Sequence, residues 1–186
     1  KPLGGKFSHD PANRLPWRGT PPAPAPLKFE VDDVTEEVGV LITEKFSRHP
    51  GNLDLNALPA TKSDAEMLWS WAKEQCLEWF GPYEDAMSSD STGIFHTRIS
   101  SLLNIHRLLP SRLVSDVEAL DISLPSKDGF IRQVLGWREF VHHVHAFTDG
   151  FRVGLEPPPD VLSQPGDGGY RNWTGRSRRP PPDWAP

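Results

Sequence analysis

The sequence has only one cysteine, Cys76, among its 186 residues. A single cysteine cannot form a disulfide within the chain or ligate a metal cluster alone, so an iron–sulfur cluster held by this chain only is excluded. The scarcity favours a reducing compartment, and we expect a cytoplasmic location. Cys76 lies beside an apolar helical stripe and has no obvious histidine partner in sequence, so we predict a small buried side chain in preference to a catalytic thiol.

Long apolar runs are lacking as well. No segment approaches the length of a membrane span, and the first residues, KPLGGKFSHDP, lack the hydrophobic core of a signal peptide, so we expect no membrane partner. Because the first residue is not Met, we expect the chain to begin within a larger protein or after processing. The net charge of −5 excludes a chain-wide basic surface for nucleic acid, so any such surface would be local.

What the sequence does have is proline and glycine, with 20 and 15 residues, alongside an apolar content of only 37%. This composition predicts that part of the chain is loop, linker or tail. We predict an extended lead-in at residues 1–32, where PPAPAP favours polyproline conformation, a helical region at 33–150, and a Pro/Gly/Arg-rich tail or insertion at 151–186. No useful strand alternation occurs, so the ordered part is predicted to be all-α.

Helical periodicity predicts helices at residues 33–48, 64–79, 97–106, 111–120 and 127–147. Asp32 or Asp33 is available to cap the first of these, and the sequence from Ser63 to Glu66 resembles a capping box for the second. We expect the second helix to end at FGP, residues 80–82, before a polar loop at 83–93. Gly136 is costly inside a helix, so we expect it to mark close packing.

One stretch, GIFHTRISSLLNIHRLLP at 93–110, mixes polar residues into an apolar pattern. Thr97 and Ser100 are three residues apart at a predicted helix start, where two hydroxyls and free backbone N–H groups would suit an anion such as a diphosphate. The alternative is that Thr97 and Ser100 merely cap a core helix.

Two other clusters of the 127–147 helix are candidates for chemistry. His142, His143 and His145 lack the i, i+4 spacing of zinc-binding helices, so we predict solvated or packed histidines and no metal site. Arg138 could belong, with Arg132 and Glu139, to a surface ion-pair array of little energetic value.

Four motifs in one order change these alternatives. GGKFSHDPANR at 4–14, FGPYEDAM at 80–87, IFHTRISSLLN at 94–104 and GFIRQVLGWREF at 129–140 together resemble the cryptochrome and photolyase superfamily. The resemblance is greatest to its bacterial branch of deoxyribodipyrimidine photolyase-related proteins, whose members carry an iron–sulfur cluster. It implies a partial helical FAD-binding domain, comprising the connecting segment and the first part of that domain, with extended proline-rich segments at both ends.

The resemblance also implies roles for individual residues. The implied catalytic residues are Gln133 and Trp137, which would lie on neighbouring turns of one helix face, a polar contact and an aromatic wall for an extruded base. The implied FAD-binding residues are Tyr83, His96, Thr97, Ile99, Ser100 and Arg138.

The implied function of the complete protein is FAD-dependent, light-driven DNA repair, a carbon–carbon lyase reaction, or blue-light sensing. The chain would be inactive alone, and its partners would be damaged DNA and the remaining photolyase domains or a second polypeptide. The alternative is a non-enzymatic helical interaction module that has lost FAD. A third hypothesis is sequence-independent DNA binding through Arg171, Arg176, Arg178 and Arg179.

Overall fold

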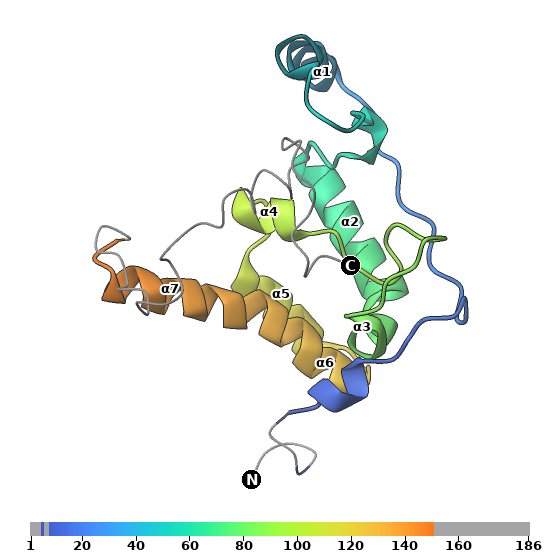
Figure 1. Cartoon of the computed structure of the whole chain (residues 1–186), viewed down its shortest axis with the longest axis vertical. Coiled ribbons are helices and arrows are strands. Elements are labelled where there is room, and N and C mark those ends of the chain that lie inside the picture. The colour runs from blue at the N-terminus through green and yellow to red at the C-terminus, as the bar shows by residue number, and fades with distance from the viewer. Residues whose placement is uncertain (1–4, 6–7, 151–186) are drawn as a thin grey trace, which may run out of the picture. The chain divides into compact units, whose positions relative to one another are not determined.

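The computed structural model describes residue 5 and residues 8–150 (Figure 1). No strand occurs in that part of the chain, which confirms the predicted all-α class. The chain divides into two compact units, Lys1–Glu139 and Phe140–Pro186, and each is described by itself. The predicted tail at 151–186 lies outside the described residues, as do Arg171, Arg176, Arg178 and Arg179, and the predicted domain boundaries remain a prediction.

The helices are named in chain order: η2 Asp10–Asn13, α1 Asp33–Phe46, η3 Leu55–Ala57, α2 Lys62–Gln75, α3 Leu77–Tyr83, α4 Ser100–Asn104, α5 Pro110–Ala119, α6 Leu124–Ile131, η4 Arg132–Gly136 and α7 Trp137–Phe147. The predicted helices at 33–48 and 111–120 are confirmed as α1 and α5. Asp32 caps α1 as expected, because its side chain accepts a hydrogen bond from the backbone N–H of Thr35. None of the described helices is long and apolar enough to cross a membrane.

The predicted helix at 64–79 is two helices. The capping box is formed by Thr61 and Asp64, earlier than predicted, and α2 ends at Gln75. A second helix, α3, then continues through Pro82, so the expected end at residues 80–82 is wrong. Proline removes a helical N–H, which would leave the carbonyl of Glu78 without a donor. The hydroxyl of Ser126 on α6 donates to that carbonyl at 2.8 Å instead.

The crossing of α3 and α6 is close. Ser126 is fully buried, and its hydroxyl also accepts a hydrogen bond from the backbone N–H of Gly81 at 3.1 Å. A Cβ atom on Gly81 would lie 2.7 Å from the Cα of Ser126, so only glycine allows this approach. The two helices are therefore fixed against each other by one glycine and one hydroxyl.

The main core lies along α2. Trp69 is fully buried and stacks on Phe130 of α6 with ring centroids 5.7 Å apart, and Phe80 meets the same ring edge-on at 5.4 Å. Other buried members are contributed by α2, α4 and α5, including Ala65, Leu68, Ala72, Leu102, Leu103, Leu113 and Val117.

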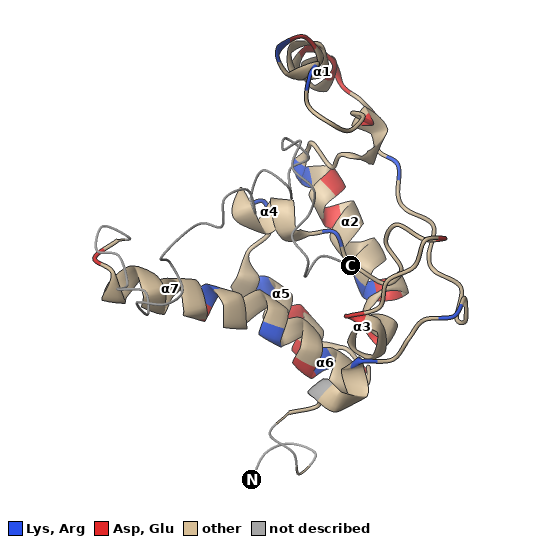
Figure 2. Ribbon diagram, in the orientation of Figure 1, with Lys and Arg blue, Asp and Glu red and all other residues tan. Residues whose placement is uncertain are grey.

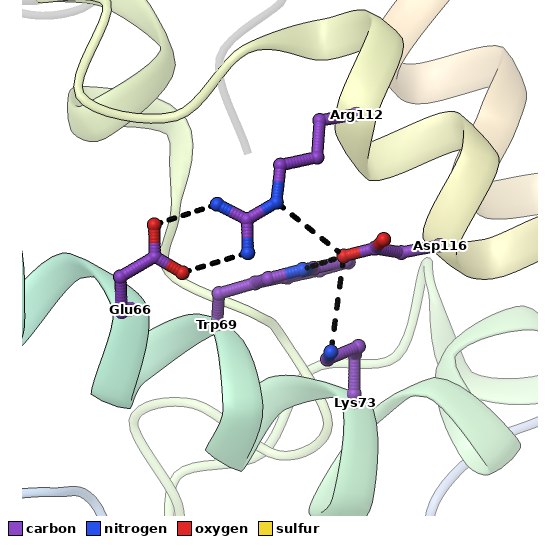
Figure 3. Close-up of polar contacts among 5 residues, drawn as sticks. All are labelled: Glu66, Trp69, Lys73, Arg112 and Asp116. Atoms are coloured by element: carbon purple, nitrogen blue, oxygen red, sulfur yellow. Dashed lines mark hydrogen bonds and ion pairs between the residues drawn. The ribbon is translucent and has the colours of Figure 1, made fainter.

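A charged cluster covers the edge of this core where α2 meets α5 (Figure 3). Arg112 donates two parallel hydrogen bonds to the carboxylate of Glu66, at 2.6 and 2.7 Å. Asp116 accepts from the indole Nε1 of Trp69 at 2.7 Å and lies 3.8 Å from the ammonium of Lys73. The indole N–H of the largest core residue is therefore satisfied without breaking the apolar packing.

The N-terminal lead-in packs on the helices. Asn13 is 1% exposed, and its amide Nδ2 donates to the carbonyl of Pro125 at the start of α6. The backbone N–H of Leu15 donates to the carbonyl of Pro82 at 3.0 Å. Phe29, also buried, exchanges hydrogen bonds with Asn56 through its backbone. This segment thus holds α3 and α6 from one side.

The predicted helix at 127–147 begins earlier, at Leu124, and contains a π-helical turn, η4, between α6 and α7 (Figure 1). The expectation that Gly136 marks close packing is wrong, because none of the described residues has an atom within 4 Å of a Cβ built there. Gly136 is instead the last residue of the π-helical turn η4. Single π-helical turns within α-helices are often found at functional sites.

Candidate functional site

A pocket of about 410 Å³ opens between α3, the segment 96–104 and the η4 turn. Its lining residues are Phe80, His96, Thr97, Arg98, Ile99, Ser100, Leu103, Asn104, Phe130, Gln133, Val134 and Arg138. Six of them are residues for which the sequence implied a role: His96, Thr97, Ile99, Ser100, Gln133 and Arg138. Segments more than 30 positions apart in the sequence therefore meet at one pocket, although their individual roles remain predictions.

One wall is the segment before α4, which is not the helix expected at 97–106. Arg98 has a φ of 59°, a left-handed conformation that interrupts a helix, and α4 covers only Ser100–Asn104. The predicted pair of hydroxyls at a helix start is therefore corrected. Thr97 is buried and precedes the helix, while Ser100 is exposed and opens it.

Gly93 and Cys76 help to shape this wall. The backbone N–H of His96 donates to the carbonyl of Gly93 at 2.7 Å, closing a turn. A Cβ on Gly93 would collide with the guanidinium of Arg98, so glycine leaves room for that side chain. The thiol of Cys76 lies under the turn and reaches the carbonyl of His96 at 3.9 Å.

Cys76 is fully buried, as predicted from its position beside the apolar stripe. Burial raises the pKa of its thiol to about 12, an effect that the positive charge of Arg98 only partly opposes. A thiol with so high a pKa stays protonated at neutral pH and is a poor nucleophile. Cys76 therefore supports the pocket wall and supplies no chemistry.

The opposite wall is the widened helical turn η4. Arg138 is half-buried, and its Nη1 donates to the carbonyl of Val134 at 2.6 Å. This bond uses one of the five N–H groups of the guanidinium, and Arg138 also contributes to the pocket lining. A backbone carbonyl therefore holds the Arg138 side chain. The alternative, a surface ion-pair array with Arg132 and Glu139, stays a prediction.

The charge of the lining is one-sided. Arg98, Arg138 and His96 contribute to the lining, and none of the lining residues in the described part of the chain is an Asp or Glu. Thr97 and Ser100 add hydroxyls. In a chain of net charge −5, a pocket that is lined by two arginines and by no described carboxylate is suited to an anion, because guanidinium forms charge-assisted, bidentate bonds to phosphate.

Two of the implied residues lie away from the pocket lining. Tyr83 stacks on Phe95, with centroids 5.5 Å apart, and its hydroxyl donates to the carbonyl of Thr20 at 3.3 Å. Trp137 is 62% exposed, and its indole Nε1 donates to the side-chain oxygen of Gln133 at 3.0 Å. Gln133 therefore links the pocket to an exposed aromatic ring, as expected for neighbouring turns of one helix face.

The sequence comparisons agree with these motifs. A family model described as deoxyribodipyrimidine photo-lyase-related protein matches residues 1–57. A protein named (6-4) photolyase, from Agrobacterium fabrum (strain C58 / ATCC 33970), is 29% identical over 158 residues. The match covers 78% of this chain and 29% of that relative. The chain is thus similar to photolyase-related proteins.

The chain spans less than a third of that relative's length. Sequence reasoning missed Arg98, Asn104 and the two aromatic walls Phe80 and Phe130. Arg98 lies within the recognised motif, between Thr97 and Ile99, and its basic charge could have indicated a role. Nothing local in the sequence indicates the aromatic walls, because they depend on the α3–α6 crossing.

Metal chemistry has no support at this site. In the part of the chain that the structure describes, no three His, Cys, Asp or Glu residues are grouped to hold a metal ion. His142 and His143 lie in the second unit, where their rings are 5.7 Å apart.

Proposed function

We propose that this chain supplies one part of an FAD site of photolyase type and that its pocket binds the diphosphate of the cofactor. The observation that carries the proposal is that Arg98, Arg138 and Thr97 line one pocket to which no described Asp or Glu contributes. Two guanidinium groups and a buried hydroxyl fit the charge and acceptor oxygens of a diphosphate. The α4 helix is too short to contribute a substantial dipole, so side chains carry the recognition.

The size of the pocket fits a part of the cofactor. Small-molecule pockets commonly measure about 300–1,000 Å³, and about 410 Å³ lies near the lower limit. Phe80, Phe130 and Val134 add apolar surface to the lining, which would exclude water and strengthen charge interactions with a bound anion. The rest of the cofactor would be enclosed by residues outside this chain, which spans 29% of its relative.

Bound FAD would supply light-driven electron transfer to a damaged pyrimidine pair in DNA. The chain's own contribution would be orientation. Gln133 and Trp137 are joined by a hydrogen bond and are exposed on the helix that carries Arg138, where an extruded base could stack on the indole and bond to the amide. Light-driven repair and blue-light sensing would both use the FAD site. They would differ in the contact of Gln133 and Trp137 with DNA.

The test is flavin binding by the purified chain, alone and combined with the remaining part of the photolyase-length polypeptide. We expect Arg138→Ala to weaken FAD binding by about ten-fold or more, because a charge-assisted bond contributes about 1.5–3 kcal/mol. Riboflavin, which lacks the diphosphate, should bind the variant and the wild type equally. The matched control is Arg132→Ala, since Arg132 is exposed on the same helix and pairs with Asp128 at 3.2 Å.

Equal FAD affinity of the Arg138→Ala and Arg132→Ala variants would contradict the proposal. So would the absence of flavin absorbance when every part of the polypeptide is present. The latter result would favour the non-enzymatic interaction module, a second candidate that is supported by the exposed apolar face of α1.

A further inference from the structure

The glycine at the start of one pocket wall, Gly93, is buried and lies against the side chain of Arg98. A Cβ atom built on Gly93 would lie 2.7 Å from the Cζ of the guanidinium and 2.9 Å from its Nε, which is too close for any carbon atom. The φ of Gly93 is not in the left-handed region, so its backbone would accept alanine. Glycine therefore provides space at this position, and its conformational freedom is not needed.

The backbone around Gly93 is held in place by the turn that it opens. Its carbonyl accepts a hydrogen bond from the N–H of His96 at 2.7 Å, and the N–H of Ile94 donates to the hydroxyl of Ser91 at 3.1 Å. The side chain of Ile94 is 4% exposed and belongs to the second apolar cluster of the chain. Because the turn is anchored in this way, a side chain added at Gly93 would displace the Arg98 side chain in preference to the backbone.

Arg98 is able to move in this way. It is exposed, and none of the described residues is seen to form a hydrogen bond or an ion pair with it. Arg138 in the opposite wall differs, because its guanidinium is held by the carbonyl of Val134 at 2.6 Å. The charge of Arg98 still lies near the turn, since it partly opposes the effect of burial that raises the pKa of the Cys76 thiol to about 12. Space at Gly93 is therefore the closest constraint on where the Arg98 guanidinium lies.

The position of this guanidinium matters because the wall has no other full charge. Arg98 is the only Lys, Arg, Asp or Glu residue from Gly93 to Asn104, which includes the segment that leads into α4 and α4 itself (Figure 2). Charge-assisted N–H···O bonds to a phosphate have lengths of about 2.7–2.9 Å and weaken steeply when they are misaligned. A displaced guanidinium would therefore lose most of its interaction with an anion in the pocket.

We propose that Gly93 is a positioning residue of the anion pocket: because it has no side chain, the guanidinium of Arg98 lies where it can bind the anion. This role rests on the proposed diphosphate site and extends it, because Gly93 is not among the lining residues and acts through Arg98. A larger residue at position 93 would displace the guanidinium and leave the other lining residues in place. The affinity for a diphosphate would then fall while the fold is kept.

The experiment is a double-mutant cycle on FAD affinity, measured with the chain combined with the remaining part of the photolyase-length polypeptide. Gly93→Ala should weaken FAD binding by about three-fold or more, because residues in direct contact are commonly coupled to at least this extent. In the Arg98→Ala background the same substitution should have no effect, since no guanidinium remains to be displaced. Riboflavin, which lacks the diphosphate, should bind equally to the wild type, both single variants and the double variant.

The matched control is Gly39→Ala on α1. Gly39 is also buried, and a Cβ there would lie 2.8 Å from the end of the flexible Leu55 side chain, which does not line the pocket. We expect this variant to bind FAD as the wild type does. Circular dichroism shows whether each variant keeps its helices. If Gly93→Ala alone failed to fold, the Gly93→Ala/Arg98→Ala double variant should fold, because the collision is removed.

Three outcomes would overturn the positioning role of Gly93. These are unchanged FAD affinity of Gly93→Ala, an equal loss with and without the Arg98 side chain, or failure of both the single and the double variant to fold. Inorganic pyrophosphate, titrated into the same four proteins, separates this role from the proposed function. Coupling of Gly93 and Arg98 in pyrophosphate binding without any FAD binding would contradict the FAD proposal alone, whereas binding of neither ligand would overturn both.

Discussion

Two helices of equal length, α1 and α2, have opposite environments. Each has 14 residues, a side-chain N-cap and an amphipathic pattern. Yet α2 buries Ala65, Leu68, Trp69 and Ala72, whereas α1 buries only Gly39. Both helices are capped, although α1 contains Gly39 and several β-branched residues that disfavour a helix, and the clearest difference is whether another element covers the apolar face.

The covered helix also has its polar groups satisfied across the interface. Figure 3 shows Trp69, Glu66 and Lys73 of α2 engaged with Arg112 and Asp116 of α5. Among the described residues, α1 packs on another element through Gly39, which lies against Leu55 of η3. An apolar stripe in the sequence therefore predicts a helix face that another element covers, but it does not identify that element.

The largest expected effect contrasts two leucine truncations. Leu68→Ala, at a side chain 4% exposed in the core of α2, should lower the free energy of unfolding by about 2–5 kcal/mol. Leu41→Ala on α1, where the side chain is 49% exposed, should change it by less than about 0.5 kcal/mol in the isolated chain. Urea denaturation measures both. Equal losses would mean that α1 is already covered in solution.

An intermediate effect is expected from removing hydroxyls. Ser126→Ala leaves the carbonyl of Glu78 and the N–H of Gly81 without their partner inside the α3–α6 crossing, so stability should fall by about 1–3 kcal/mol. Thr43→Ala is the counterpart on α1, where the hydroxyl donates to the carbonyl of Gly39 within one helix. That change should be nearly neutral in thermal unfolding, since alanine favours a helix. A larger loss from Thr43→Ala would reverse the comparison.

Local sequence signals predicted the helical class and the individual helices α1 and α5 well. These depend on periodicity and caps such as Asp32, which act within a few residues. The continuation of α3 through Pro82 could not be predicted in this way. It depends on Ser126, 44 positions away, whose hydroxyl replaces the missing donor.

The candidate site was predictable to a different degree. The order of motifs brought His96, Thr97 and Arg138 forward as a set, and the fold places them on one pocket. The left-handed Arg98 and the aromatic walls were not predictable, because backbone φ and helix crossings are set by tertiary contacts. Likewise, both apolar stripes were visible in the sequence, but their different burial was not.

The smallest expected effect concerns the ion pair at the covered interface. The guanidinium of Arg112 lowers the pKa of Glu66 below its usual value of 4.5, mainly through their hydrogen bonds. Because the folded-state pKa is depressed, the stabilisation is present above pH 4.5 and is lost as the pH falls through the folded value. Both side chains are more than a third exposed, so solvent screening limits the contribution to about 0.2–1 kcal/mol.

Glu66→Gln should therefore reduce stability slightly at pH 7, and less so below pH 4 or at high salt. Glu44→Gln, at an exposed carboxylate on α1, is the control, and we expect no such convergence with wild type at low pH. The measurement is urea denaturation of both variants between pH 3 and 7. If the stabilities of Glu66→Gln and Glu44→Gln changed with pH in the same way, the Glu66–Arg112 ion pair between α2 and α5 would contribute no stability beyond that of the apolar packing beneath it. The distinction between the covered and the uncovered helix would then depend on apolar contact alone.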